Sequence, residues 1–449
     1  MVPQFLWNQN FFNLEALLVY NVEKPSHNIL IIPIILNRNE KILFRIKIIT
    51  HKKYMKTWLF RASLLITLIV ISPILAHSQA TTQEPVQITI NPQKGVRFVS
   101  ADGFMEFRLG FRLQQQIVLS QIVSDKEALK GEYVIRRQRT QIRGSLFHKK
   151  LDFFVQIAMD RGKPALLNAE YRWKPDNYTE ISFGQLYPTT FRQFQTSSSS
   201  LQMIDRSNVI RFFYTDYDLG IRIRRTLQVA DNFQLKLAGA LTHGEGKNVA
   251  TASGGWAYMG RFAVLPFGAF KNSGDYKESD LFREESPKLS IGTGYYINND
   301  AYTKFGDAVW DGMDDDIQDT FADLLFKYNG FSFLTEYIYR VVDNEILSLN
   351  GEIYAADIIS GEGLYIQSGK FVTDQIELTS RFNYLNPNNA NQTQRANFTE
   401  QKKFALGFNY FFQGHSIKLQ SQLGYVTEQY EAIKSLNYFE LLTQFTISF

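Results

Sequence analysis

The chain has 449 residues, with 48 Lys and Arg against 44 Asp and Glu, and it contains no cysteine. Disulfides, zinc–thiolate sites, iron–sulfur clusters, cysteine nucleophiles and a lipid-bearing cysteine are therefore excluded. The mean hydropathy of −0.21 also excludes a bundle of membrane-spanning helices. The formal net charge of +4 is unevenly distributed along the chain.

A secretory signal is predicted over residues 55–80. Met55–Arg61 is a short basic start, residues 62–71 (ASLLITLIVI) form an apolar run, and Ser78-Gln79-Ala80 ends in the small residues that a signal peptidase reads. The alternative is a transmembrane helix, but the run is too short to span and Pro73 interrupts its end. We expect Met55 to be the true start, which makes residues 1–54 a doubtful upstream extension; a real N-terminal extension is the alternative.

The charge reverses between the two halves of the remaining chain. Without residues 1–80 the chain has 39 basic and 41 acidic side chains, a net charge of −2. Residues 81–240 carry a net +8 and residues 241–449 a net −10. Such a reversal requires a structural cause.

Period-two alternation dominates the sequence after residue 103, and residues 81–103 before it are assigned to a periplasmic N-terminal segment. In 104–119, Met105, Leu109 and Ile117 fall on one face, and Arg108 and Arg112 on the other. Successive side chains of a strand point to opposite faces, so this strand has an apolar and a polar face. It is also about three times the usual length of a soluble strand.

Sixteen such strands are predicted, and many are long enough to cross a membrane at a tilt. They are 104–119, 132–146, 150–160, 165–174, 178–187, 217–229, 232–243, 256–266, 288–298, 318–329, 330–342, 361–372, 375–386, 400–412, 414–428 and 434–449.

The connections between these strands alternate in length. Short ones, such as Asn329-Gly330, have hairpin-turn chemistry, whereas 188–216 and 387–399 are long. Short turns at one end and long loops at the other are typical of an outer-membrane barrel. Two connections break the rule, because 161–164 is short where a loop is expected and 267–287 is long where a turn is expected. The predicted number of strands is therefore sixteen, to within about two.

The fold class we predict is all-β, a transmembrane antiparallel barrel over 104–449. A soluble sandwich would have shorter strands and a partner sheet. Aromatic residues near strand ends, such as Trp173 and Tyr438, suit the two membrane interfaces, and the chain ends in an alternating strand with terminal Phe449. Closure into a ring also satisfies every backbone polar group in lipid.

Arginines gather on the polar faces of several strands. Arginine stays charged and is costly on the lipid face, so these faces are expected to point into the lumen. There they would give a permeating anion successive partners. The predicted anion pathway comprises Arg108, Arg112, Arg137, Arg139, Arg143, Arg222, Arg224 and Lys418. The alternative is that these cations merely balance inward acids such as Glu106, Asp152, Asp160, Glu170 and Glu180.

Residues 188–216 form the longest connection of the first half, and we expect them to fold into the lumen as a constriction loop. The candidates on this loop are Arg192, Ser197, Ser198, Asp205 and Arg206. A serine run more commonly marks an exposed flexible loop, and Asp205-Arg206 can also be a local structural pair.

No catalytic or metal site is predicted, and no cofactor. Asp307, Asp311, Asp314, Asp315, Asp316 and Asp319 cluster in a later loop, but their spacing does not fit a calcium loop, so a solvated acidic loop is favoured. His148, His243 and His415 are scattered, with no obvious Ser or acid partner.

Four stretches resemble the phosphate-selective porin O and P family. They are Arg136–Gln156, the segment from Gly184-Gln185 to Asp205-Arg206-Ser207, Asp218–Ile221, and Asn409–Gln420. The resemblance implies a sixteen-stranded outer-membrane barrel, often trimeric, that passes small anions such as phosphate. The family commonly has Lys three residues after the Gly of the Gly-Gln pair, where this chain has Tyr187. That difference weakens the phosphate assignment and leaves the fold unaffected.

We therefore predict a porin of the bacterial outer membrane that gives passive diffusion to small hydrophilic solutes, with a preference for anions. Its expected partners are outer-membrane lipid, small anions, the barrel assembly machinery and further copies in a homotrimer, and not nucleic acid. The alternatives are a non-selective or structural barrel and, less favoured, a barrel-borne hydrolase. A TonB-coupled transporter would need a plug domain and more strands than this length provides.

Overall fold

A computed structural model covers the chain, which divides into two units, residues 1–83 and 84–449. In the first unit the structure describes only two paired strands, β1 (Glu15–Ala16) and β2 (Ile34–Ile35). In the second it describes residues 86–91, 95–123, 129–249, 255–301, 304–305, 308–309, 315–343, 346–349, 352–355, 360–387, 400–430 and 435–449. The predicted signal segment lies outside the described residues and stays a prediction, as do the domain boundaries.

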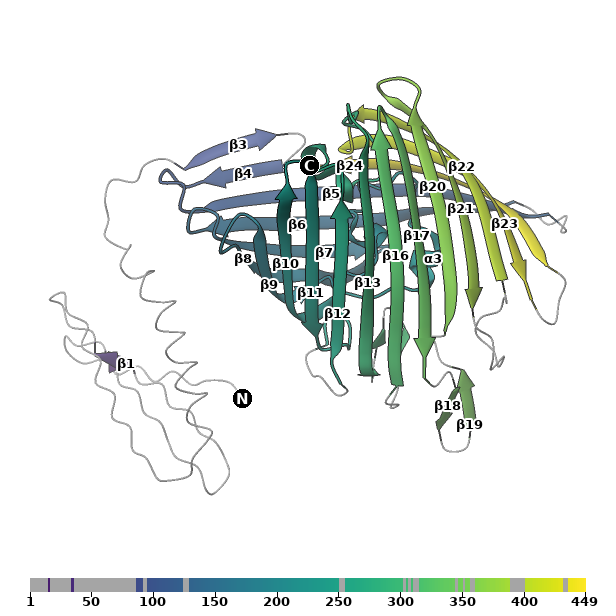
Figure 1. The fold of residues 1–449 in the computed structure, drawn as a ribbon, viewed down its shortest axis with the longest axis horizontal. Coiled ribbons are helices and arrows are strands. Elements are labelled where there is room, and N and C mark those ends of the chain that lie inside the picture. Colours follow the sequence, from purple (N-terminus) through teal and green to yellow (C-terminus); the bar gives the residue numbers. More distant parts are fainter. Residues whose placement is uncertain are drawn as a thin grey trace. The chain divides into compact units, whose positions relative to one another are not determined.

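Sixteen of the described strands form a closed antiparallel barrel (Figure 1), in which each strand pairs with the next one in the ring and β24 pairs with β5. They are β5 (Glu106–Ile122), β6 (Lys130–Leu146), β7 (Leu151–Asp160), β8 (Lys163–Trp173), β9 (Thr179–Leu186), β10 (Asp218–Ala230), β11 (Phe233–Thr242), β12 (Ala257–Leu265), β13 (Lys288–Ala301), β16 (Asp315–Tyr328), β17 (Phe331–Val342), β20 (Gly361–Phe371), β21 (Ile376–Pro387), β22 (Glu400–Gln413), β23 (Ile417–Gln429) and β24 (Leu436–Ser448). The predicted fold class is confirmed, and no strand end differs from its predicted position by more than three residues.

The alternation along each strand separates an outer apolar face from an inner polar one. On β10, Ile221 and Ile223 are exposed on the outside, whereas Arg222 between them is buried inside. In a bilayer the outer side chains contact lipid, and ring closure pairs the backbone N–H and C=O groups that would otherwise face hydrocarbon. The polar and charged residues of the strands are thereby concentrated in the lumen.

A hairpin of β3 (Gln87–Asn91) and β4 (Gly95–Val99) precedes the barrel. It extends the edge of β5, where Val96–Val99 pair with Leu109–Glu106. The pairing of β24 with β5 ends at Ser448 opposite Arg112, so the hairpin continues the sheet from the point where the C-terminal strand stops. Figure 1 shows the hairpin beside β5 and the C-terminus close by.

The connections follow the predicted pattern at most positions, and both expected exceptions are present. The turn between β7 and β8 is short, and the connection from β12 to β13 is long and contains the 3-10 helix η1 (Lys271–Tyr276). Short additional strands lie in two of the long loops: β14 (Lys304–Phe305), β15 (Ala308–Val309), β18 (Ile346–Leu349) and β19 (Glu352–Ala355). The short-turn end is the periplasmic end in barrels of this kind.

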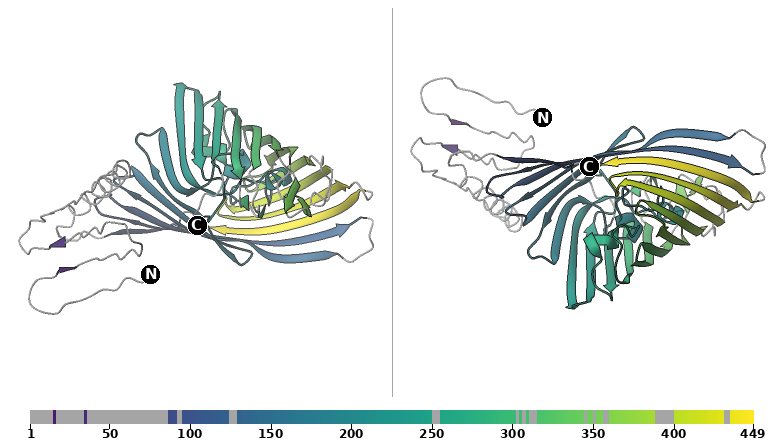
Figure 2. Two further views of the ribbon diagram at one scale, coloured as in Figure 1. Left: turned by 90° about the horizontal axis from the view of Figure 1, so that it is seen from below. Right: turned by 90° about the horizontal axis from the view of Figure 1, so that it is seen from above.

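The connection from β9 to β10, residues 187–217, folds into the barrel, and we call it the lumen loop (Figure 2). It contains two short helices, α2 (Arg192–Gln195) and α3 (Asn208–Phe212); Ser207 caps α3 by accepting a hydrogen bond from the backbone N–H of Val209. Among the described residues, no helix is long and apolar enough to cross a bilayer.

The lumen loop carries its own apolar core against the inner wall. Phe191, Val209 and Phe213 are fully buried and cluster with Phe321 of β16 and Tyr365 of β20. Burial of such side chains stabilises each by about 1.5–3 kcal/mol, which offsets the cost of ordering a long loop.

A glycine on β20 makes the close approach of α3 possible. A Cβ built on Gly363 would lie 2.6 Å from Val209 Cγ1 and 3.1 Å from the ring of Phe213. A larger residue at this position would push the loop off the wall.

Candidate functional site

Four arginines form two adjacent pairs on the lumen face of β5 and β6. In the register of these strands Arg112 lies opposite Arg139, and Arg108 lies opposite Arg143. Arg108 and Arg112 are four residues apart on β5, and so are Arg139 and Arg143 on β6, so period-two alternation alone places all four on one face and brings these like charges together. Like charges directly opposite are destabilising unless they have partners.

The partners of the four arginines differ. Arg139 forms an ion pair with Asp160 at 2.8 Å, and Arg108 forms one with Glu106 at 3.1 Å. Arg112 donates to the hydroxyls of Ser198 (2.8 Å) and Ser197 (2.9 Å) of the lumen loop.

Arg143 has the weakest attachment of the four. It donates to the side-chain oxygen of Gln141 at 3.2 Å, and its guanidinium lies over the ring of Phe154, 4.4 Å from the centroid. Within the described residues, neither Arg112 nor Arg143 has a carboxylate partner, so two positive charges on this wall remain uncompensated by direct ion pairs.

The arginines of β10 are compensated by acids. Arg222 forms ion pairs with Glu170 (3.1 Å) and Glu180 (3.5 Å) and donates to the carbonyl of Tyr187 (2.7 Å). Arg224 lies 3.6 Å from Glu180. For these two positions the structure favours the alternative weighed from the sequence, charge balance across the wall.

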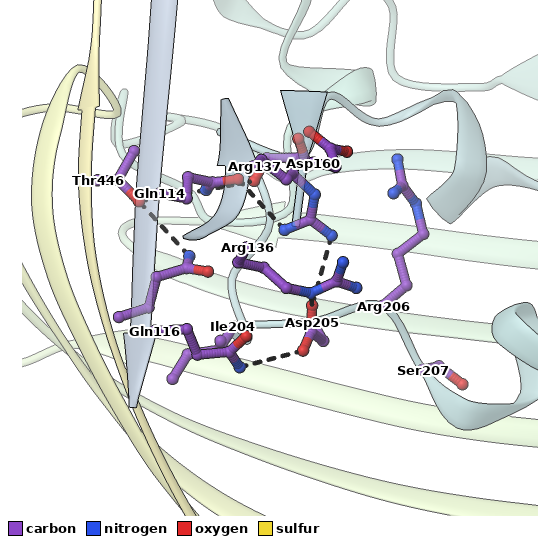
Figure 3. A network of polar contacts seen from close by, with 12 residues as sticks. Gln114, Gln116, Arg136, Arg137, Asp160, Ile204, Asp205, Arg206, Ser207 and Thr446 are labelled. Atoms are coloured by element: carbon purple, nitrogen blue, oxygen red, sulfur yellow. Dashed lines mark hydrogen bonds and ion pairs between the residues drawn. The ribbon is translucent and has the colours of Figure 1, made fainter. Parts of the chain in front are cut away.

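Arg137 takes part in a network that fixes the tip of the lumen loop (Figure 3). Asp205 accepts hydrogen bonds from Arg136 (3.0 Å), Arg137 (3.4 Å) and Gln116 (3.2 Å). Arg136 can reach the lumen because the register of β5 and β6 shifts between Gln114 and Gln115, which leaves Arg136 unpaired in a bulge. Strict alternation from the sequence places Arg136 on the lipid face, so this residue was missed.

Asp205 is the acid that holds this network together. Burial raises the pKa of the Asp205 carboxyl. The nearby charges of Arg136 and Arg137 together lower it by more, so its pKa lies below the usual range. The side chain is thus an anion at neutral pH, and it neutralises part of the basic wall at the point where the loop crosses it.

Arg206 is held by the lumen loop itself. It donates to the carbonyls of Gln193 (3.2 Å), Phe194 (3.2 Å) and Thr196 (2.8 Å), and its guanidinium lies 4.8 Å from the centroid of the Phe194 ring. These are the carbonyls at the end of α2, which carry partial negative charge. Among the described residues Arg206 has no carboxylate partner, so the alternative of a local pair with Asp205 is not realised.

The lumen loop is seated on acids of the opposite wall. Arg192 forms an ion pair of 2.5 Å with Asp323 of β16, which also pairs with Arg261 of β12. The backbone N–H of Arg192 and that of Gln193 donate to Glu336 of β17 at 2.6 and 3.2 Å. All of these groups are buried, so Arg192 anchors the loop on the acidic side of the barrel.

Lys418 lies under the lumen loop, and its side chain is 0% exposed. Its ammonium donates to the carbonyl of Leu201 at 2.7 Å. Lys418 therefore holds the lumen loop in place and does not face open lumen, so it is not part of the anion path.

Two further sequence expectations are clarified by the structure. Tyr187, at the position where the resembled family commonly has Lys, is buried, stacks on Phe194 at 4.1 Å and bonds to Thr190 at 2.6 Å. The expectation that Asp315, Asp316 and Asp319 belong to a loop is wrong, because all three lie on β16; Asp319 faces inward and pairs with Arg340 at 2.6 and 2.7 Å. Asp307, Asp311 and Asp314 lie outside the described residues.

A pocket of about 270 Å³ opens beside the basic wall at the short-turn end. Its lining has five basic side chains against two acidic ones: Arg108, Arg143, Lys149, Arg172 and Lys174, with Glu106 and Asp152. Among the described residues no group of His, Cys, Asp or Glu is arranged to hold a metal ion.

The model of one protein family, described as phosphate-selective porin O and P, matches residues 107–445, which is nearly the whole barrel. The chain belongs to this family. It is accordingly a porin of the bacterial outer membrane. No curated protein is significantly similar to it in sequence.

Several solved outer-membrane proteins match this porin in a comparison of structures. OmpF of Salmonella typhi, in complex with daunomycin, is 10% identical to this chain in sequence. The match covers 81% of this chain and 100% of the OmpF chain, with a TM-score of 0.50. An anion-selective porin from Comamonas acidovorans is 11% identical, with 77% and 100% covered and a TM-score of 0.48. The channel DcaP of Acinetobacter baumannii is also 11% identical, with 78% and 99% covered and a TM-score of 0.47. At this identity, the likeness to OmpF shows a shared barrel fold.

Proposed function

We propose that this porin conducts small anions along the basic wall formed by the inner faces of β5–β8. The observation that carries the proposal is that Arg112, beneath the serines of the lumen loop, and Arg143, exposed below it, have no carboxylate partner among the described residues. The acids of this wall are already engaged, Asp160 by Arg139 and Asp152 by Lys174.

Unused hydrogen-bond donors support the same wall as the anion path. The Nε atoms of Arg112 on β5 and Arg172 on β8 are buried, and neither has a hydrogen-bond partner in the structure. Buried donors are rarely left unpaired, and a guanidinium is a bidentate donor suited to carboxylate or phosphate oxygens.

The arrangement suggests stepwise passage of a hydrated anion. Arg112 with Arg139 comes first from the long-loop end, then Gln141, then Arg143 with Arg108, and then the basic pocket beside Lys149. Inward residues on one strand repeat every two positions, about 7 Å apart, so an anion can contact the next site before leaving the last. Multiple weak sites of this kind favour conduction over tight binding.

Phosphate is one candidate anion, and its selection over chloride is a separate question. Tyr187 provides no cation at the position where the family commonly has Lys, and its hydroxyl is engaged by Thr190 and Thr215. We therefore propose a general preference for small anions and expect phosphate to compete with chloride only weakly. Conductance in KCl with added phosphate would measure that competition.

The proposal can be tested with Arg112→Gln combined with Arg143→Gln, which removes the two uncompensated charges. In a planar bilayer under a KCl gradient, the wild type should give an anion-selective reversal potential, and the double variant should lose most of it. Arg225→Gln is the matched control, because Arg225 is exposed near the short-turn end and pairs with Asp176 at 3.6 Å. A cation-selective wild type would refute the proposal.

The lack of catalytic activity and the homotrimer stay predictions that follow from family membership. Cross-linking of the purified porin in detergent, compared before and after heating, would establish the number of copies. A hydrolase screen on the same preparation would examine the first point.

A further inference from the structure

The connection from β12 to β13, residues 266–287, enters the barrel from the short-turn end, where strands are otherwise joined by short turns. We call it the inner turn. Its rim, Lys271–Ser273 and Glu285–Pro287, is exposed, whereas Gly274, Asp275 and Glu278–Asp280 are buried. A polar segment that buries its charges inside a barrel is costly unless each of them is matched.

The inner turn is fixed to the barrel wall by backbone and side-chain contacts. The ammonium of Lys327, on β16, donates to the carbonyls of Gly274 (2.9 Å), Lys277 (2.7 Å) and Ser279 (2.9 Å). Asp280 in turn accepts from the backbone N–H of Gly330 at 2.7 Å. Lys327 is almost fully buried, and its three donors are all used on the turn.

The same turn also holds the lumen loop. Glu278 accepts from the side chain of Gln193 at 2.9 Å and from the backbone N–H of Gln202 at 2.7 Å, both on the lumen loop. Its second oxygen also accepts from Gln367 of β20 at 3.0 Å. A further contact joins Arg192 to the carbonyl of Asp275 at 2.7 Å. One carboxylate thus connects the turn, the loop and the wall.

Together the turn and the loop cover the acidic side of the lumen. Asp323, Glu336 and Glu377 face inward on β16, β17 and β21, and all three are buried. Glu377 is sealed from both sides, since it accepts from Ser279 of the inner turn (2.8 Å) and from Gln202 of the lumen loop (2.6 Å). Without this cover, the carboxylates would face water and attract cations, as acidic rings do in cation channels.

We propose that the inner turn is a second, periplasmic plug, which locks the lumen loop and excludes ions from the acid-lined half of the barrel. It determines ion specificity indirectly, by leaving the basic wall as the single conducting path. This role rests on the anion preference proposed above for that path. The inner turn itself contacts no permeating ion.

Glu278→Gln is the most conservative test. The glutamine amide replaces one accepting oxygen with a donor that faces other donors. The free energy that holds the lumen loop in place should fall by about 1–3 kcal/mol, which raises the population with a released loop roughly 5- to 150-fold. We expect higher single-channel conductance, more open-channel noise and a reversal potential shifted toward cations. If Glu278 merely contributed charge to the path, its removal would shift the potential toward anions, so the sign separates the two roles.

Glu285→Gln is the matched control on the same turn. Glu285 is exposed on the rim and pairs with Lys271 at 2.8 Å, so its neutralisation should leave conductance and noise unchanged. An equal response of both variants would overturn the proposal, as would Glu278→Gln channels with wild-type conductance and noise.

A second variant replaces residues 268–286 by a two-residue Asn-Gly turn, and labelling of a reporter cysteine measures access. The native chain has no cysteine, so Ser332→Cys gives a clean reporter for a cationic methanethiosulfonate reagent. Ser332 is buried on β17, where it accepts a hydrogen bond from Gln202, the lumen-loop residue whose backbone N–H donates to Glu278 of the inner turn. Labelling should be slow with the inner turn intact and fast without it, whereas Ser197→Cys, exposed on the lumen loop, should label quickly in both backgrounds.

Heat-modifiable migration on a gel confirms that each variant is folded before it is measured. Fast labelling of Ser332→Cys with the turn intact would refute the plug. A cation-selective wild type with the same labelling contrast would refute only the anion path.

Discussion

The two sides of the lumen have opposite charges, and they differ in how far those charges are covered and paired. On the basic wall of β5–β8, Arg112 and Arg143 keep charge that no described carboxylate matches. On β16–β21 the inward acids are covered, and each is matched by a cation or by donors from the loop and the turn. The reversal of net charge along the sequence therefore corresponds to two walls, the basic wall that we propose as the anion path and the acidic wall on which the lumen loop docks.

If the proposed anion path is right, the number of lumen charges does not set selectivity. The chain after residue 80 has a slight excess of acids, yet the acids of the second half hold the loop in place. A buried and paired carboxylate has little effect on an ion passing elsewhere, because its field is cancelled locally by its partner. The charges that matter are those left without partners.

The largest effect is expected from Arg192→Met, which breaks the docking wall. The substitution leaves Asp323 with Arg261 as its remaining cation and removes the bond to Ser290 at 2.6 Å. Loss of one partner of a buried ion pair costs about 3–5 kcal/mol, and we expect a fall of that size in the free energy of unfolding. Urea unfolding in detergent, followed by tryptophan fluorescence, would measure it.

Arg225→Met provides the control for this substitution, since Arg225 is half exposed on the outer side of β10. It should leave the unfolding free energy nearly unchanged, as exposed ion pairs contribute little. Equal losses for the two variants would show that the acidic wall is not a special anchoring site.

A smaller effect is expected from Asp205→Asn, which sharpens the basic wall. The change frees Arg136 and Arg137 and weakens the anchor of the loop tip, at a cost of about 1–3 kcal/mol. We expect a stronger anion preference in a KCl gradient together with more open-channel noise.

Asp160→Asn separates these two consequences. It frees Arg139 in the same way but does not touch the lumen loop, so anion preference should rise without added noise. A fall in anion preference for both variants would contradict the assignment of the basic wall as the path.

The smallest effect is expected from pH. Because Arg136 and Arg137 hold the pKa of Asp205 below its usual range, its contribution to stability is complete above the unfolded value of about 4 and is lost as the pH falls through the folded value. The difference in unfolding free energy between wild type and Asp205→Asn should therefore stay constant from pH 8 to pH 5. A difference that fades over this range would indicate a raised pKa and a weaker anchor.

Much of the barrel could be predicted from the sequence because its signal is local. Alternation placed Arg112, Arg139, Arg143 and Arg222 on the lumen face, and the unequal connections identified the loop that folds inward. The register bulge beside Gln114 could not be predicted, since a single extra residue leaves both flanking patterns intact. The sequence did indicate an unusually long connection at the short-turn end, which is the inner turn. Its length alone could not show that it folds into the barrel.

The sequence by itself determined the strands, the face of most side chains on them, and the asymmetry of charge, because period two and hydropathy act over a few neighbouring residues. Only the tertiary structure decided which charges are free. Arg112 meets Ser198 across 86 residues and Arg192 meets Asp323 across 131. Such pairings depend on where a loop is seated inside a closed ring, and no local pattern encodes that position.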